Sequence, residues 1–189
     1  MRRIVPRFLL PLLGLSLALG CGDGTAPTEA TLPAFAAVAR TGFGFNGSVS
    51  GAAGAVRLTG GGSYDPATAA AAEGAKTSGV AGGGFACTTP ITAGPLVGCQ
   101  AGQGVRWDTA RFLASSPFKC VGTESPKTAT LDGHTAVLQA DFYRAGDGEN
   151  ESFTAAMFVA DRDLDDEIPG VQNVWIQGVG CGEAIVNFN

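Results

Sequence analysis

Short runs of alternating apolar and polar residues, separated by glycine-rich turns, constrain the fold of this chain more than any other feature. In residues 135–144 the apolar side chains Ala136, Leu138, Ala140 and Phe142 fall on every second position, and residues 152–159 repeat the pattern. A period of two places one face of a strand against a core. The chain has 29 glycines in 189 residues, and its apolar positions follow almost no helical period. The alternation therefore predicts an all-β fold.

The number of alternating runs predicts about eight or nine short strands. Besides those above, the runs that we interpret as strands include residues 43–50, 54–60, 170–178 and 183–188. Asp132-Gly133 and Asp147-Gly148 lie between alternating runs, which is a strong hairpin signal. The pattern is typical of a small antiparallel barrel or a sandwich. We favour the barrel, because hairpins dominate and the last strand could close onto an early one.

One short helix is predicted within this β pattern. Asp108 or Thr109 can cap a helix over about residues 109–115, which would end before Pro117. The alanine run at residues 69–72 could form a single turn, but no apolar face organises it. We therefore interpret residues 66–84 as a low-complexity loop that leads into the next strand.

The N-terminal residues have the layout of an export signal. Arg2, Arg3 and Arg7 precede an apolar stretch at residues 8–20, which is shorter than the roughly 20 residues that span a bilayer. The run Leu17-Ala18-Leu19-Gly20-Cys21 resembles a bacterial lipobox, although Ala18 stands where leucine is commonest. The resemblance implies cleavage after Gly20 and acylation of Cys21. A plain secretory signal is the alternative.

The lipobox resemblance divides the chain and implies its location. Residues 1–20 would be the signal peptide, residues 21–40 a lipidated tether rich in Gly, Ala, Thr and Pro, and residues 41–189 the β domain. Two or more acyl chains hold a protein stably on a membrane. The lipid bilayer is therefore a predicted partner, and the cell envelope is the predicted location. By the same resemblance, Gly22 permits delivery to the outer membrane of a Gram-negative cell.

Four cysteines remain after Cys21: Cys87, Cys99, Cys120 and Cys181. An even number in an exported chain indicates two disulfides, for which three pairings are possible. We favour Cys87–Cys99, which closes a short loop, and Cys120–Cys181, which ties a late segment to the middle of the chain. A metal site is disfavoured, because no two of these cysteines have CxxC spacing.

Charge argues against a nucleic-acid partner. Removal of residues 1–20 takes away three of the twelve basic residues and leaves nine against seventeen acidic ones, a formal charge of −8. A strongly acidic protein is repelled by phosphate backbones and by anionic lipid. We interpret the acidic surface as a solubilising one.

Acidic residues in the run at 161–170 raise the question of calcium. Asp161, Asp163 and Asp165 match the first three ligand positions of an EF-hand loop, but Asp166 and Gln172 replace its glycine and its glutamate. The segment is therefore not an EF-hand. A looser calcium site built from these carboxylates and a polar loop are the two alternatives.

Aromatic and charged residues adjacent in sequence are the candidates for ligand binding. They are Arg106, Trp107, Asp108, Tyr143, Arg144 and Trp175. In a barrel these side chains could line one mouth, where the arginines would meet an anionic group. The alternative is that the aromatic residues belong to the core and that the arginines pair locally with Asp108 and Asp141.

No strong catalytic motif accompanies these candidates. His134 is the only histidine and follows a predicted turn, and the sequence has no GxSxG motif. The body resembles the secreted β domains without assigned activity that bacteria tether through a lipobox. We therefore expect a non-enzymatic binding or structural module without a cofactor, which recognises a small molecule, a glycan or an envelope protein. The rival hypothesis is a cofactor-free barrel enzyme, an isomerase or hydrolase, that uses the aromatic and charged candidates.

Overall fold

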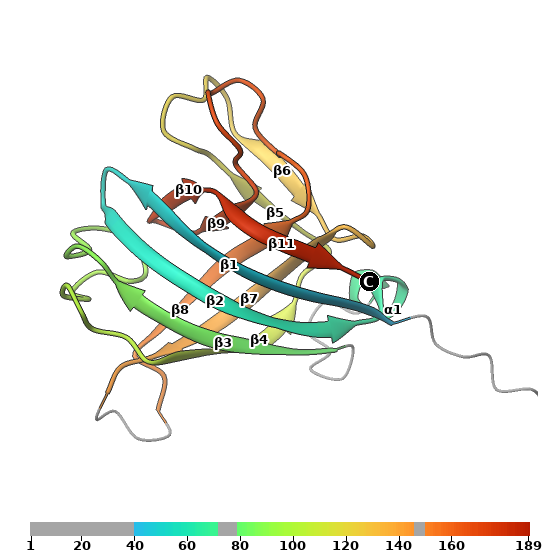
Figure 1. Cartoon of the computed structure of the whole chain (residues 1–189), viewed down its shortest axis with the longest axis horizontal. Helices are drawn as coiled ribbons and strands as arrows, with labels where there is room; N and C mark the ends of the chain where they lie inside the picture. Colours follow the sequence, from blue (N-terminus) through green and yellow to red (C-terminus); the bar gives the residue numbers. More distant parts are fainter. Residues whose placement is uncertain (1–39, 72–78, 146–149) are drawn as a thin grey trace, which may run out of the picture. The chain divides into compact units, whose positions relative to one another are not determined.

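The computed structural model of the chain describes residues 40–71, 79–145 and 150–189 (Figure 1). These residues belong to one compact unit that extends from Ala37 to Asn189. The predicted signal peptide and almost all of the predicted tether, Cys21 included, lie outside the described residues.

The described part of the chain contains eleven strands and one short helix, so the all-β prediction is confirmed. The elements are β1 (Thr41–Gly51), β2 (Gly54–Tyr64), α1 (Pro66–Ala71), β3 (Gly79–Cys87), β4 (Arg106–Phe112), β5 (Ser115–Phe118), β6 (Lys127–Thr130), β7 (Thr135–Tyr143), β8 (Phe153–Ala160), β9 (Val174–Ile176), β10 (Gly180–Gly182) and β11 (Ala184–Phe188).

Nine strands form one antiparallel sheet in the order β10-β9-β8-β7-β4-β3-β2-β1-β11, and a pairing of β10 with β1 closes it into a ring. Ser50 of β1 lies opposite Cys181 of β10, and three residues earlier Gly47 lies opposite Ala184 of β11. Because the register is the same, β10 and β11 are successive segments of one strand. The result is an up-and-down barrel that the late strand closes onto the first one (Figure 1).

Side chains fill the inside of the barrel. Trp107 is fully buried and donates its indole N–H to the carbonyl of Thr59, 3.0 Å away. The Phe45 ring lies 6.0 Å from the Trp107 ring, and Tyr64 stacks on Phe112 at 4.9 Å. The inside of an eight-stranded barrel is just wide enough for side chains to fill it or for one small ligand. Here aromatic rings take up that space.

Glycine makes room for the Trp107 ring. A Cβ atom on Gly60 would lie 2.6 Å from Cζ2 of Trp107 and 2.6 Å from the carbonyl oxygen of Gly82, far inside an ordinary contact. Part of the glycine richness of β2 and β3 is therefore a packing requirement, because the ring lies directly against bare backbone.

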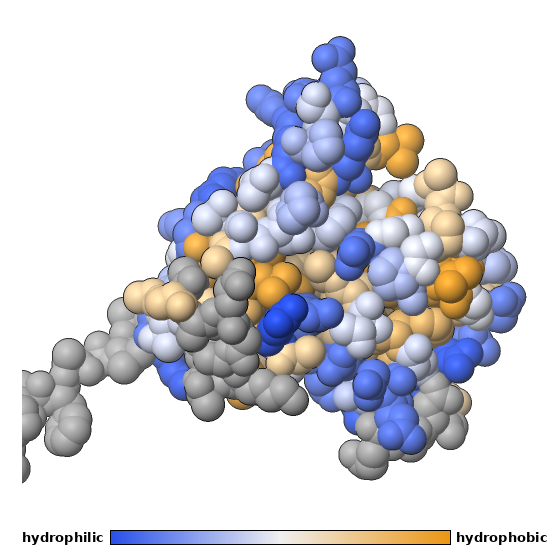
Figure 2. Space-filling model, turned by 180° about the vertical axis from the view of Figure 1, so that it is seen from behind, coloured by the Kyte–Doolittle hydropathy of each residue, from blue (hydrophilic) through white to orange (hydrophobic). Residues whose placement is uncertain are grey.

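Part of the hydrophobic core lies outside the barrel wall. The β5–β6 hairpin and the loop that joins its strands, residues 115–130, pack against the outer face of β8 and β9. Phe118 meets Phe158 edge-on at 4.8 Å, and Phe158 stacks on Trp175 at 5.9 Å. Together with the acidic loop at residues 161–170, this hairpin forms what we call the projection. It stands out from the barrel and is largely hydrophilic in its outer part (Figure 2).

Both disulfides have the pairing that the sequence favoured. Cys87 is bonded to Cys99, which holds the long β3–β4 connection against the end of β3. Cys120 is bonded to Cys181, which ties the projection to β10.

One short helix forms in the described part of the chain, but not at residues 109–115, where it was predicted. Residues 109–112 belong to β4, which pairs with β7 and has a bulge between Thr109 and Arg111. The helix that does form is α1, where Asp65 accepts hydrogen bonds from the backbone N–H of Ala67 and the hydroxyl of Thr68. An Asp at this position satisfies backbone donors of the first turn, so the alanine run needed only a cap.

The two Asp-Gly signals had different outcomes. Asp132 and Thr135 form an isolated bridge around a turn, but β6, the strand before it, pairs with β5 rather than with β7. Asp147-Gly148 lies outside the described residues, and the strands on either side of it, β7 and β8, pair as predicted.

Candidate functional site

A groove of about 760 Å³ lies between the projection and the barrel. Four segments that are distant in sequence line it: the β1–β2 turn, the β3–β4 connection, the projection and the β9–β10 turn. The lining residues are Ala52, Ala53, Thr92, Ala93, Pro117, Phe118, Lys119, Cys120, Val121, Gly122, Thr123, Pro126, Trp175, Gly178, Val179 and Gly180. The volume is within the 300–1,000 Å³ that small-molecule sites occupy.

The floor of the groove is apolar and firmly packed. Phe118 and Trp175 are only 3% and 6% exposed, and Val179 is 4% exposed. The Cys120–Cys181 disulfide lies beside them and fixes the projection to the floor. Because the rings of Phe118, Phe158 and Trp175 pack on one another, the floor is part of a core rather than a set of mobile side chains.

Close backbone contact holds the rim on the barrel side. Gly94 and Gly178 both have left-handed φ values, 82° and 79°. A Cβ atom on Gly94 would lie 2.6 Å from the Cα atom of Gly178, so the two turns touch backbone to backbone. Thr92 also donates its hydroxyl to the carbonyl of Ala53 at 3.1 Å. Three turns are thereby joined into one rim.

Lys119 is the only charged residue that lines the groove in the described part of the chain. Its side chain is exposed, and its ammonium donates to the carbonyl oxygen of Glu124 at 3.2 Å. That bond holds the Lys119 side chain against residues 120–126, the outer wall of the groove. The groove therefore combines an apolar floor with one cation at its edge.

A smaller cavity of about 370 Å³ lies on the other side of residues 120–122. Those three residues line both the cavity and the groove. Val121, 67% exposed, belongs to the lining of both.

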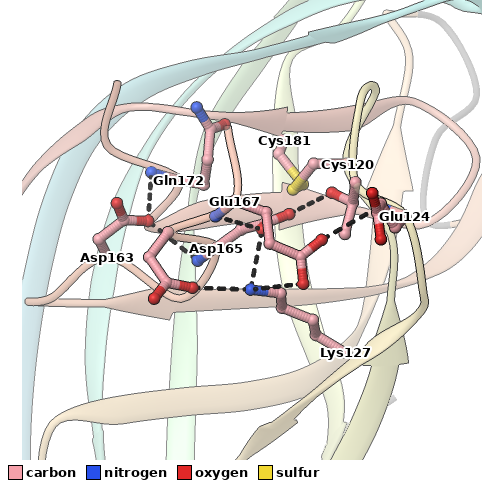
Figure 3. A network of polar contacts seen from close by, with 10 residues as sticks. Cys120, Glu124, Lys127, Asp163, Asp165, Glu167, Gln172 and Cys181 are labelled. Carbon is pink, nitrogen blue, oxygen red and sulfur yellow. Dashed lines mark hydrogen bonds and ion pairs between the residues drawn. A yellow bond between two sulfur atoms is a disulfide. The ribbon is translucent and has the colours of Figure 1, made fainter. Parts of the chain in front are cut away.

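A network of polar contacts holds the outer wall in place (Figure 3). Asp165 is fully buried, and Lys127 lies 3.0 Å from one of its carboxylate oxygens. Thr123, a residue of the groove lining, donates its hydroxyl to the other oxygen. Glu167 accepts a hydrogen bond from the backbone N–H of Glu124 at 3.1 Å. The acidic loop is thus bonded to both the backbone and the side chains of the β5–β6 hairpin.

Lys127 and Asp165 each stabilise the charged form of the other. Burial by itself would raise the pKa of Asp165, but the hydrogen bonds from Thr123 and Lys127 outweigh it and lower that pKa. Hydrogen bonds to Asp166 and Asp165 raise the pKa of Lys127 well above its ordinary value. Both residues are therefore charged across the neutral pH range.

The six predicted ligand-binding residues do not meet at one site. Arg106, Asp108 and Tyr143 do lie together, on the outer face of β4 and β7. The Arg106 guanidinium is 3.2 Å from the Asp108 carboxylate and 4.2 Å from the centre of the Tyr143 ring. This is the local ion pair that the alternative interpretation named.

The other three candidates lie elsewhere. Trp107 is inside the barrel, as the core interpretation expected. The Arg144 guanidinium lies 5.2 Å from the Phe153 ring, and the backbone N–H of Arg144 donates to the Ser152 hydroxyl. Of the six, only Trp175 belongs to the groove.

The calcium candidates Asp161, Asp163 and Asp165 also have separate partners. Asp161 lies 2.7 Å from Nδ1 of His134. Asp163 accepts the backbone N–H groups of Asp165 and Gln172 at 2.9 and 3.0 Å. The cation beside Asp165 is the Lys127 ammonium. Within residues 40–71, 79–145 and 150–189, no cluster of three or more Asp, Glu, His or Cys side chains is arranged to hold a metal ion.

Phe118 and Lys119 were missed as site residues, although the sequence held a signal for them. The predicted Cys120–Cys181 bridge already implied that the residues before Cys120 lie near those before Cys181, which include Trp175. For the rim residues 52–53 and 92–93, the sequence contains no comparable indication that they lie near the groove.

Comparison with protein-family models, with curated proteins and with solved structures finds no match for this chain. Among the described residues, no helix has the length and apolarity needed to cross a membrane.

Proposed function

We propose that this protein is a lipid-anchored binding module of the bacterial cell envelope, which takes an apolar ligand into the groove between the projection and the barrel. The observation that carries the proposal is the groove itself, whose apolar floor is packed on a core and fixed by a disulfide. Binding sites of this kind are concave, mostly apolar and largely preformed.

The groove lies at the other end of β1 from the point at which the predicted tether joins the domain. The tether would enter the barrel at Thr41, where β1 begins, whereas Ala52 and Ala53, which line the groove, follow the other end of β1. A strand of this length spans about 33 Å at roughly 3.3 Å per residue. The groove and the predicted attachment point are therefore separated by the length of β1.

A fluorescent probe of apolar sites tests this proposal. We expect 1-anilinonaphthalene-8-sulfonate to bind the folded protein with a rise in its fluorescence. We expect Ala93→Phe to weaken that binding, because Ala93 is exposed and lines the groove. Val97→Phe is the matched control, because Val97 is 54% exposed in the same connection but does not line the groove. Absence of probe binding, or equal binding by both variants and the wild type, would overturn the proposal.

The arrangement gives less support to the rival hypothesis of an enzyme. That hypothesis needs Arg106, Asp108 and Tyr143 in a cleft, where a substrate could be held against them. The side chains of Arg106 and Asp108 are instead 44% and 51% exposed, on the outer face of β4. Their contacts are with each other and with Tyr143.

A further inference from the structure

We propose that the ligand of the groove is a single-chain amphiphile with an anionic head, such as a fatty acid, and that Lys119 contacts the head group. This inference rests on the proposed function, and it adds the chemical class of the ligand and the residue that selects it.

The charge of the groove differs from that of the protein. The whole chain carries seventeen acidic and twelve basic residues, with a formal charge of −5. No acidic residue is among those that line the groove, and Lys119 is its one charged residue in the described part of the chain. A concave apolar surface with one sign of charge at its edge favours ligands of the opposite charge. The complementary ligand is thus apolar along its length and negative at one end.

The position of Lys119 suits a head-group contact. Phe118 before it is buried in the floor and Cys120 after it is bonded to the barrel, so the backbone of Lys119 is fixed on both sides. A lysine ammonium has three donors. One of them is bonded to the carbonyl oxygen of Glu124, which orients the group and leaves donors for the oxygens of an anion.

The floor favours an alkyl chain over a sugar. Sugar recognition through an aromatic residue needs an open ring face, and Trp175 is only 6% exposed. One face of Trp175 stacks on Phe158, and Phe118 packs against it as well. The floor consists of ring edges, aliphatic side chains and a disulfide, and a methylene chain gains about 0.8 kcal/mol for each group that it buries there.

Three amphiphiles with one chain length and different heads test the inference. We would titrate dodecanoate, dodecyl maltoside and dodecyltrimethylammonium, each below its micelle-forming concentration, and measure displacement of the fluorescent probe. We expect dodecanoate to bind about fivefold more tightly than the neutral maltoside, the upper end for a solvent-exposed ion pair. We expect the cation to bind most weakly.

Charge reversal separates the head-group contact from general attraction. Lys119→Glu should abolish the preference for dodecanoate and favour dodecyltrimethylammonium. Arg57→Glu changes the net charge equally on the outer face of β2, away from the groove, and should leave the preference intact. Similar binding of all three amphiphiles, or equal effects of the two substitutions, would overturn the assignment of the ligand class.

Such a failure is distinguishable from failure of the proposed function. If Ala93→Phe still blocked the probe while head groups made no difference, the groove would remain a binding site and only the anionic class would be wrong. If neither the probe nor any amphiphile bound the wild type, both proposals would be wrong.

Discussion

A single methyl group placed at two glycines should have opposite effects on stability. Gly60→Ala brings a Cβ atom to 2.6 Å from the Trp107 ring and 2.6 Å from the backbone of Gly82. Overpacking of this kind costs about 1–3 kcal/mol, against a gain of about 0.5 kcal/mol from the stiffer unfolded chain. In Gly44→Ala the nearest atom would be the carbonyl oxygen of Gly60 at 3.9 Å, so only the gain applies. Neither glycine has a left-handed φ.

We therefore expect Gly60→Ala to destabilise the protein by about 1.5 kcal/mol and Gly44→Ala to stabilise it by about 0.5 kcal/mol. Urea unfolding followed by circular dichroism measures both free energies, and tryptophan fluorescence adds a direct view of the strain, because the ring that must move is that of Trp107. Equal stability of the two variants would refute the packing of Trp107 against bare backbone, and with it the description of the barrel as filled.

The remaining predictions concern the disulfides, the polar network and the anchor. Loss of the Cys120–Cys181 disulfide, whose cysteines are 61 residues apart, should lower the free energy of unfolding by about 4 kcal/mol. Loss of Cys87–Cys99, whose cysteines are 12 residues apart, should lower it by about 3 kcal/mol, because the shorter loop restricts the unfolded chain less. The reverse order in urea unfolding would contradict this entropic argument. Asp165→Asn should cost about 2 kcal/mol at pH 7, because it removes a charged hydrogen-bond acceptor that is buried. Because folding lowers the pKa of Asp165, that cost should be present above the pKa of an unfolded Asp, about 3.9, and disappear as the pH falls through the folded value; a cost that did not decrease with falling pH below about 3.9 would contradict it. Lys127→Met should also destabilise the protein and weaken probe binding, since it loosens the groove wall, and unchanged thermal melting would count against the network. Cys21→Ser should move the protein from the membrane to the soluble fraction, and an unmodified intact mass of the wild type purified from membranes would rule out the anchor.

The alternation of apolar and polar residues predicted most of the barrel, because each strand has one side facing the core and one facing solvent. The wrongly predicted helix at β4 has a local cause. Trp107 and Phe112 both point inward, yet they are five positions apart, which an unbroken strand does not allow. The bulge between Thr109 and Arg111 shifts the alternation by one residue. Once the period of two was broken, the capping residues at positions 108 and 109 favoured a helix. Pairing with β7 and burial of two large rings outweigh that local preference.

The same alternation could have corrected the predicted ligand cluster. Neighbouring residues in a strand point to opposite faces, so Arg106 and Trp107, which are adjacent in β4, cannot both face one site. The groove was less accessible to sequence reasoning. It is built where three turns and a hairpin meet, and its lining is mainly Ala, Gly, Pro and Val. Only the disulfide linked any of these segments in advance.

Closure of the barrel through β1 and β11 has a consequence for the order in which the protein folds. Phe43 pairs with Phe188, and their rings lie 5.7 Å apart. Strand β1 therefore has no partner on one side until almost all of the remaining sequence has been synthesised. Pairings this distant in sequence slow folding, because the entropy of a very long loop is lost before the contact forms. Until β11 pairs with it, β1 presents an open strand edge, through which the incomplete chain can aggregate.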